Sequence, residues 1–541
     1  MKRIRHFVLH YRLGITRIFL IIFFACFVIL PLLRMLFHIT ADGLRTVFSE
    51  EGFGILIWNS LLSAVTATVI TLILSYTLAA CMERSNIKYR GFWGIILVLP
   101  MLIPSISHGM GLVVLLGNNG LLTRLLNLQG NIYGFQGIVA GSVMYAFPVA
   151  FLMFRDVLRY QDYTPYQAAK VLGIPPYRQF TAITLPYLKK PLISITLAIL
   201  TMIITDYGVP LMVGGKFKTL SVALYQEVIG QLNFDKGSVY GLLLLFPALA
   251  CFLFDVLNKD KGNNTFAYGN VALSKNTLRD MAARLICVVI ALVVLLPIIA
   301  FALLAFSNRY PTDISFTLKN LKDAVRLNAG TYLSNSIIIA LVVAIVGVVL
   351  ASCTAYLTAR TKANTSKILH LLAITSAAIP GVVLGLAYVL VFRGSFIYAT
   401  LAILIMVNII HFISSPYLMM YNSLSKLNEN LEDVGHTLGV SRFRIVMDVL
   451  IPQSLSTIME MFSYFFVNSM MTISAVSFLS TTANKPIALM INQFEAQMQL
   501  GAAAIVSLAI LFVNLIIKGT IGIGKWSIQK RRNALHKADA E

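Results

Sequence analysis

Charged residues are scarce in this chain of 541 residues. Asp, Glu, Lys and Arg together make up 12% of it, whereas 58% of its residues are hydrophobic. Soluble globular proteins carry about twice that share of charged residues, so this composition excludes an ordinary soluble protein. The polar stretches between the apolar runs are too short to bury a core of their own. We therefore expect no folded domain outside a membrane.

Cysteines are rare as well, and the five that occur lie far apart in the sequence. They show neither the spacing of metal ligands nor a plausible disulfide framework. We interpret them as small apolar packing residues and expect no metal site. They are Cys26, Cys81, Cys251, Cys287 and Cys353.

Convincing patterns for nucleotide binding or catalysis are also missing. The stretch Gly519–Lys525 follows most of the phosphate-loop pattern, but Trp526 stands where Ser or Thr is required, and the stretch ends an apolar run. No set of His, Asp and Ser and no pair of carboxylates indicates catalysis. We expect that the chain is not an enzyme and binds no cofactor itself, so its energy source lies in other proteins.

Long apolar runs are what the sequence has in abundance. About 20 apolar residues cross a bilayer as a helix, and the strict alternation of a membrane β-barrel is missing. The sequence therefore predicts an all-α membrane protein with about twelve transmembrane helices. Their expected cores are residues 17–37, 55–81, 92–116, 132–154, 192–214, 238–257, 284–306, 334–358, 368–392, 399–420, 455–479 and 500–518.

The net charge of +21 is distributed as in a membrane protein, so we expect no nucleic acid partner. Lys2, Arg3 and Arg5 precede the first predicted span, and Lys530 and Arg531 follow the last. Basic residues concentrate in cytoplasmic segments, where they also meet anionic lipid headgroups of the bilayer. This distribution predicts that both termini are cytoplasmic.

The chain also contains an internal repeat. Six spans in each half give both halves the same orientation, so the sequence predicts two parallel repeats. We expect a first half at 1–257, a cytoplasmic linker at 258–283 and a second half at 284–541. The matching pairs are Asn59 with Asn335, Pro104 with Pro380, Gly109 with Gly385 and Pro148 with Pro416.

A polar loop occurs once in each half, at 167–186 and 433–452. In both copies a Gly is followed by a Pro at the same distance, as Gly173 and Pro186, and as Gly439 and Pro452. A Gly in the left-handed conformation ends a helix. Pro175 and Pro176 in the first copy, and Ser441 as N-cap in the second, then favour a new helix start. The pattern predicts a helix–Gly–helix knob on the cytoplasmic face of each half.

The two loops resemble the EAA loop of permease subunits of binding-protein-dependent type I ABC importers. The first copy keeps the pattern with Gln in place of Glu; in the second, Asp takes that place and Val and Gly replace the two alanines. The resemblance covers both halves, as in the fused branch with two permeases in one chain, and residues 205–210 (TDYGVP) also resemble that branch. The matching positions are Gln167, Ala168, Ala169 and Gly173, and Asp433, Val434, Gly435 and Gly439.

The resemblance implies a function and partners. In that family each loop is a coupling helix docked on a cytosolic ABC ATPase, so two ATPase copies and an extracytoplasmic substrate-binding protein are expected, with ATP used by the ATPases. It also implies location in the bacterial inner membrane. Members of the branch move ferric iron, thiamine, polyamines or aminoalkylphosphonates, and ferric iron is the substrate we expect first.

Several residues within predicted spans are candidates for the translocation path. Asp206 is the most embedded carboxylate; it either lines the path or caps its own helix locally. His108 follows Pro104 in a helix interrupted by Pro and Gly, as cavity-lining helices of transporters are; the alternative is a histidine hydrogen-bonded within the bundle. Pro380 is the counterpart of Pro104. Asn408 and His411 lie one turn apart, as two metal ligands on one helix face would, but we prefer hydrogen bonding between helices as their role.

One alternative class stays open at this point. A secondary transporter driven by an ion gradient can also have twelve spans in two parallel halves. It would need ionisable relay residues inside the bundle, which are scarce here, and it would have no use for paired cytosolic loops.

Overall fold

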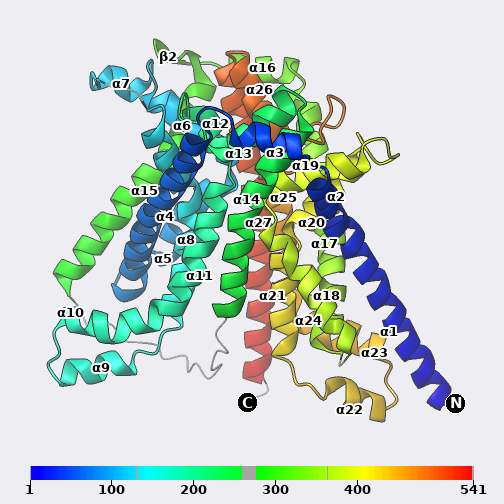
Figure 1. Cartoon of the computed structure of the whole chain (residues 1–541). Coiled ribbons are helices and arrows are strands. Elements are labelled where there is room, and N and C mark those ends of the chain that lie inside the picture. Colours follow the sequence, from blue (N-terminus) through cyan, green and yellow to red (C-terminus); the bar gives the residue numbers. More distant parts are fainter. Residues whose placement is uncertain (1, 130–131, 259–275, 362, 539–541) are drawn as a thin grey trace.

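A computed structural model describes residues 2–129, 132–258, 276–361 and 363–538. It is almost entirely helical (Figure 1). The first half contains α1 (Lys2–Phe24), η1 (Ala25–Ile29), α2 (Leu30–Phe37), α3 (Ala41–Phe48), α4 (Phe53–Arg84), α5 (Arg90–Val98), η2 (Leu99–Leu102), α6 (Ser105–Leu116), α7 (Leu121–Leu125), α8 (Phe135–Arg159), α9 (Thr164–Val171), α10 (Pro176–Gln179), η3 (Phe180–Thr184), α11 (Leu185–Ile204), α12 (Gly208–Val213), α13 (Leu220–Tyr225), η4 (Gln226–Gly230) and α14 (Phe234–Asn258).

The second half has a similar but not identical order of elements, and it adds a two-stranded antiparallel hairpin in which Ser307 pairs with Phe316 and Arg309 with Asp313. Its elements are α15 (Thr277–Phe306), β1 (Ser307–Arg309), β2 (Asp313–Phe316), α16 (Lys319–Arg326), α17 (Ala329–Ala359), α18 (Asn364–Thr375), η5 (Ser376–Ala378), α19 (Gly381–Phe392), α20 (Leu401–Phe412), α21 (Ser414–Ser425), α22 (Leu431–Thr437), α23 (Arg442–Ile445), η6 (Val446–Leu450), α24 (Ile451–Gln453), α25 (Leu455–Met471), η7 (Ile487–Leu489), α26 (Met490–Ala496) and α27 (Leu500–Ala538).

The predicted all-α membrane fold is confirmed. Among the described residues, eight helices are long and apolar enough to cross a membrane, and the number reaches twelve if each of four bent helix pairs is one span. The predicted spans 92–116 and 368–392 are bent by 96° and 110°. Their second segments begin directly after Pro104 and Pro380, because a proline has no N–H for the helix ladder and disfavours helical geometry in the residue before it.

Some boundaries differ from the prediction. The fifth span runs over residues 176–204 and ends before Asp206, whereas 192–214 was predicted. Similarly, α25 ends at Met471 and not near residue 479. Helix α15 begins at Thr277, inside the range expected as linker, and linker residues 259–275 lie outside the described residues. The phosphate-loop-like stretch at Gly519 is continuous helix within α27.

The two halves exchange their first spans. Helix α1 packs against α17 and α18, and α2 against α19, while α15 packs against α4, α5 and α6 as well as against α27 of its own half. Arg17 of α1 donates to the Thr361 hydroxyl of the second half at 2.6 Å. Reciprocally, the Asp280 carboxylate of α15 accepts from the Asn86 amide of the first half at 3.0 Å. Each half is therefore anchored to the other at the ends of α4 and α17.

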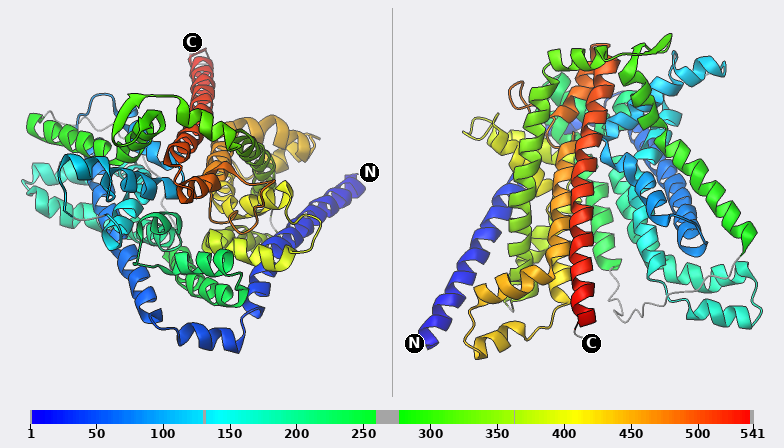
Figure 2. Two further views of the ribbon diagram at one scale, coloured as in Figure 1. Left: turned by 90° about the horizontal axis from the view of Figure 1, so that it is seen from above. Right: turned by 180° about the vertical axis from the view of Figure 1, so that it is seen from behind.

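Short helices gather at both ends of the long ones. Helices α9, α10, α22 and α23 lie at one end, together with the N- and C-termini, and α9 and α22 are far apart from each other (Figure 1). The view from behind shows the same arrangement (Figure 2). Helices α3, α7, α16 and α26 lie at the opposite end. The two polar loops therefore project from the same end of the bundle, as parallel repeats require.

Candidate functional site: paired loops and the cavity between the halves

The first polar loop folds as the helix–Gly–helix unit that the sequence predicts. Helix α9 is terminated by Gly173, which has φ +68°. The Ile174 amide then donates back to the Ala169 carbonyl at 2.9 Å, as in a Schellman motif. Pro176 stands at the start of α10, which continues through the π-helical turn η3 into α11.

The second loop repeats this geometry position by position, offset by 266 residues. Gly439 has φ +76°, and the Val440 amide donates to the Gly435 carbonyl at 2.8 Å. Ser441 caps α23 by accepting from the Arg444 amide at 3.3 Å, as the sequence predicts. The π-helical turn η6 corresponds residue for residue to η3. Two different sequences therefore give one backbone path.

Both short helices leave the same face uncovered. Gln167 and Ala168 of α9 are exposed, as are Asp433 and Val434 of α22. The leucines that follow each helix are also exposed: the relative accessibility is 74% for Leu172 and 75% for Leu438. Matching apolar side chains thus protrude at the same end of both halves.

The opposite face of each short helix packs against its own loop. Ala169 and its counterpart Gly435 are both buried. A Cβ atom on Gly435 would lie 2.3 Å from Cδ1 of Ile445, so the missing methyl makes room for that side chain. In the first loop, Gln179 stands at the position of Ile445 and donates to the Ile174 carbonyl at 2.7 Å. Of the two alanine positions, the Ala168 position, which is Val434 in the second loop, is therefore on the exposed face. The Ala169 position, which is Gly435, is in an internal contact.

An arginine at the end of a long helix holds each short helix. In the first half, Arg84 of α4 donates to the Gln161 side chain at 2.6 Å and to the Tyr166 hydroxyl at 3.1 Å. In the second half, Arg360, directly after α17, forms an ion pair with Glu432 of α22, with Nε 2.9 Å from Oε1. The Glu432 carboxylate raises the pKa of Arg360 above its ordinary value.

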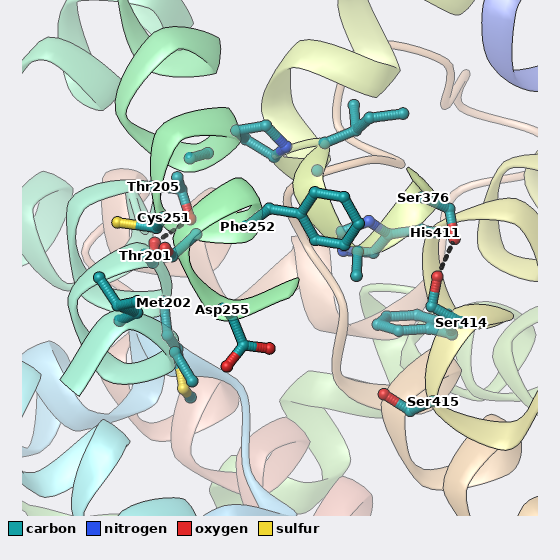
Figure 3. A pocket seen from close by; sticks show the side chains of 18 of the residues that line it. Thr201, Met202, Thr205, Cys251, Phe252, Asp255, Ser376, His411, Ser414 and Ser415 are labelled. Atoms are coloured by element: carbon teal, nitrogen blue, oxygen red, sulfur yellow. Dashed lines mark hydrogen bonds between the residues drawn. The ribbon is translucent and has the colours of Figure 1, made fainter. Parts of the chain in front are cut away.

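A cavity of about 400 Å³ lies between the halves. Side chains from α11 and α14 face side chains from η5, α20 and α21 across it (Figure 3). Its lining runs from Asp206, just after α11, to Asp255, in the last turn of α14. Because that turn lies on the side of the bundle where the polar loops are, the cavity extends toward α9 and α22.

On the other side of the cavity the two halves touch directly. The Tyr207 hydroxyl donates to the Ile473 carbonyl at 3.3 Å, and the Tyr225 ring lies against Phe478 of the second half with centroids 6.2 Å apart. Nearby, the Ser107 and Ser507 hydroxyls are hydrogen-bonded at 3.1 Å. Contacts between the halves therefore separate the cavity from the end that carries α3, α7 and α16.

The predicted path residues fall into two groups. Asp206, Pro380 and His411 line the cavity. Asp206 also accepts a hydrogen bond from the Val209 amide at 3.0 Å. It therefore combines the two roles considered from sequence, a local backbone contact and a place in the lining of the path. Outside the cavity lining, His108 is fully buried in α6 and Pro104 caps that helix.

Asn408 is buried and donates to the Leu404 carbonyl of its own helix at 2.9 Å, so it lies apart from the cavity lining although His411 is one turn away.

Sequence reasoning missed other lining residues. Asp255 was visible as a carboxylate near the end of the predicted span 238–257, which is a usable signal for a cavity mouth. Tyr145 and Tyr464 gave no such signal, because a tyrosine within an apolar run is equally suited to packing. Hydroxyl groups from both halves complete the lining: Ser194, Thr201, Thr205, Ser376, Ser414, Ser415 and Ser474.

Comparison with known proteins agrees with this architecture. Residues 75–259 and 347–523 each match the family described as binding-protein-dependent transport system inner membrane component. The chain is 25% identical to the ferric transport system permease protein of Actinobacillus pleuropneumoniae, over 86% of this chain and 71% of that protein. It is 21% identical to an Fe(3+)-transport system permease protein of Haemophilus influenzae, over 88% and 91%.

A thiamine transport system permease protein of Haemophilus influenzae is 24% identical over 38% of this chain and 40% of that protein. Each of the two family matches lies in one half of the chain and includes one of the polar loops. The chain therefore belongs to the family of binding-protein-dependent transport system inner membrane components, as a fused permease of an ABC importer that carries both halves in one polypeptide.

Proposed function

We propose that this permease imports ferric iron, and that α9 and α22 couple it to two copies of a cytosolic ABC ATPase. ATP is then hydrolysed on those partners, while this chain itself binds no cofactor. An extracytoplasmic binding protein delivers the substrate. In this arrangement α9, α22 and both termini are cytoplasmic, and the end with α3, α7 and α16 faces outward.

The equal geometry of the two loops is the observation that carries the coupling proposal. Identical backbone turns with exposed apolar tips, one per half and at the same end, suit two copies of the same partner. The contact surface on each side includes Gln167, Ala168 and Leu172, or Asp433, Val434 and Leu438. Exposed apolar side chains in the same geometry on both loops would be stabilised by burial in a groove of the partner.

The chemistry of the cavity supports a cationic substrate. Two carboxylates, Asp206 and Asp255, contribute to its lining, and none of the described lining residues is a Lys or an Arg. The tyrosine, serine and threonine hydroxyls add oxygen donors, which hard cations prefer. This lining disfavours anions such as an aminoalkylphosphonate. Ferric iron is favoured among the cations because two relatives that span most of the chain are named as ferric transporters.

Transit of the ion would require only loose contacts. Within the described residues, no three His, Cys, Asp or Glu side chains come together as metal ligands. A ferric ion in the cavity would thus meet single carboxylates and hydroxyls in succession. Weak, multiple sites favour passage over retention.

Reconstitution with the partner ATPase and binding protein tests both parts. Uptake of labelled ferric iron is compared with uptake of thiamine, a polyamine and an aminoalkylphosphonate. Transport of one of the others in place of iron would overturn the substrate assignment but not the coupling assignment.

Coupling is tested with Leu172→Asp and Leu438→Asp, with Leu125→Asp as the matched control. Leu125 is an exposed leucine of α7, at the opposite end. The two loop variants should lose co-purification of the ATPase, and the control should retain it. ATPase binding that is unchanged in both loop variants would overturn the coupling assignment.

A further inference from the structure

The two arginines that hold the short helices occupy equivalent places but meet different chemistry. Arg360 and Glu432 are almost completely buried, with side-chain accessibilities of 3% and 7%. Arg360 also donates to the carbonyls of Leu427 and Asn428, at 3.0 and 2.7 Å. The second short helix is therefore joined to α17 by a buried ion pair with additional backbone contacts.

In the first half, Tyr166 stands at the position of Glu432 and carries no charge. Its hydroxyl lies 3.1 Å from the Arg84 guanidinium, 2.8 Å from the Gln161 amide and 2.6 Å from the Thr184 hydroxyl. The Arg84 guanidinium also lies over the Tyr166 ring, 5.1 Å from its centroid. The first short helix is thus held by hydrogen bonds from the Arg84 guanidinium to uncharged side chains and by a cation–π contact.

Both contacts adjoin the places where the halves are anchored to each other. Arg17 of the exchanged helix α1 binds Thr361, the residue after Arg360. Asp280 of the exchanged helix α15 binds the amide of Asn86, two residues after Arg84. A displacement of either short helix would therefore reach its own half through the arginine and the other half through the exchanged helix.

We propose that Arg360 and Glu432 form a latch that transmits movement of α22 to α17, and that Arg84 with the uncharged partners Tyr166 and Gln161 is its equivalent in the first half. These are positioning residues, because they hold α9 and α22 in place but are not part of the exposed faces that would contact the ATPase. The inference rests on the proposed coupling function. It adds that the ion pair, when broken, leaves a charge buried without its partner, so the second latch fails more completely than the first.

A pair of substitutions tests this difference. Glu432→Gln should lower the substrate transported per ATP hydrolysed roughly tenfold or more. The Arg360 charge would stay buried without its counter-ion, which strongly destabilises the contact between α22 and α17. Tyr166→Phe should lower the same ratio several-fold less, because Arg84 keeps its hydrogen bond to Gln161 and loses no counter-ion. Binding of the ATPase should be retained in both variants. Asp323→Asn, in an exposed ion pair of α16, is the control and should leave the ratio unchanged.

If Glu432→Gln reduces folding, the proposal can still be tested by building the uncharged partners of Arg84 into the second half. Gln161, Tyr166 and Thr184 correspond to Leu427, Glu432 and Leu450, so Leu427→Gln, Glu432→Tyr and Leu450→Thr together rebuild the first latch in the second half. This triple variant should recover most of the ratio lost in Glu432→Gln.

Two results would overturn the latch: a normal ratio in Glu432→Gln, or a triple variant that folds and binds the ATPase yet stays uncoupled. Uptake by the unmodified permease without ATP would instead overturn the proposed function itself, so the two failures are distinguishable.

Discussion

The two polar loops have the same backbone but different side chains at nearly every internal contact. The first uses Ala169 where the second uses Gly435 against Ile445, and the first starts its second helix with prolines where the second uses the Ser441 cap. At the turn itself, both loops retain a Gly with positive φ. This difference teaches that the path of the loop is what the fold preserves, and that local packing compensates for each side-chain change.

The largest expected effect comes from removing both glycines that the loops share. Gly173→Val and Gly439→Val force a β-branched residue into the left-handed region, at about 1–3 kcal/mol per site. The turns should reorient, so the double variant should lose transport and bind the ATPase weakly. Uptake and co-purification measure the two effects.

Matched variants with Asn at the same positions serve as the control, because Asn tolerates the left-handed conformation. They should retain most transport. Normal transport by the double Val variant would contradict the requirement for the shared turn.

The next effect separates the loops at their internal contact. Gly435→Ala places a methyl against Ile445, and overpacking of this kind costs about 1–3 kcal/mol. Ala169→Gly in the first loop removes a methyl from a helix and should cost only about 0.5–1 kcal/mol. Thermal unfolding in nanodiscs, together with hydrogen exchange of α22 and α9, measures both.

Ile445→Val should rescue Gly435→Ala, because it removes the Cδ1 atom that the new methyl would meet. A Gly435→Ala variant that is as stable as the original protein, or one that Ile445→Val does not improve, would refute the compensation between these two positions.

A smaller effect concerns the start of the second helix in each loop. Ser441→Ala removes the cap of α23 and should cost about 1 kcal/mol. Ser441→Pro introduces the residue that the first loop has at this position; the two backbones already agree, with φ −67° at Pro175 and −70° at Ser441. Hydrogen exchange of α23 should be faster in the Ala variant and near normal in the Pro variant. Equal acceleration in both would show that the loops are not interchangeable here.

The smallest effect is a difference in pH response between the loops. The Asp162 carboxylate accepts from the amide and the hydroxyl of Thr164, which lowers the pKa of Asp162. Because the folded pKa is depressed, this stabilisation of α9 is complete above the unfolded value of about 4 and is lost as the pH falls through the folded value. The corresponding bond, from the Asn430 amide to the Asn428 side chain, does not titrate.

Hydrogen exchange at the start of α9, corrected for its intrinsic pH dependence, should therefore accelerate relative to the start of α22 as the pH falls below about 4. Asp162→Asn should remove this difference. An identical pH response in the variant would exclude Asp162 as its source.

Much of each loop could be predicted from sequence because its determinants are local. Gly173, Gly439 and Ser441 act within a few residues of themselves, so their spacing was sufficient. The partners of the short helices could not be predicted: Arg84 is 82 residues from Tyr166, and Arg360 is 72 residues from Glu432. No periodicity links positions so far apart.

The membrane part follows the same rule. Hydropathy alone located most of the spans, although it placed the fifth too far along the chain, and Pro104 and Pro380 mark where two of them bend. The exchange of the first spans depends on contacts such as Arg17 with Thr361 and Asp280 with Asn86, between segments far apart in the chain. Likewise, whether Asp206 or His108 reaches the cavity depends on how the bent spans pack, which composition does not encode.

The most direct test of the central claim is uptake into proteoliposomes that contain this chain, its ATPase and its binding protein. We predict uptake of ferric iron that requires ATP, stops when the ATPase is omitted, and is not restored by a proton or sodium gradient. Uptake driven by such a gradient in vesicles without the ATPase would contradict this prediction. The chain would then be a secondary transporter, and its two loops would not couple transport to an ATPase.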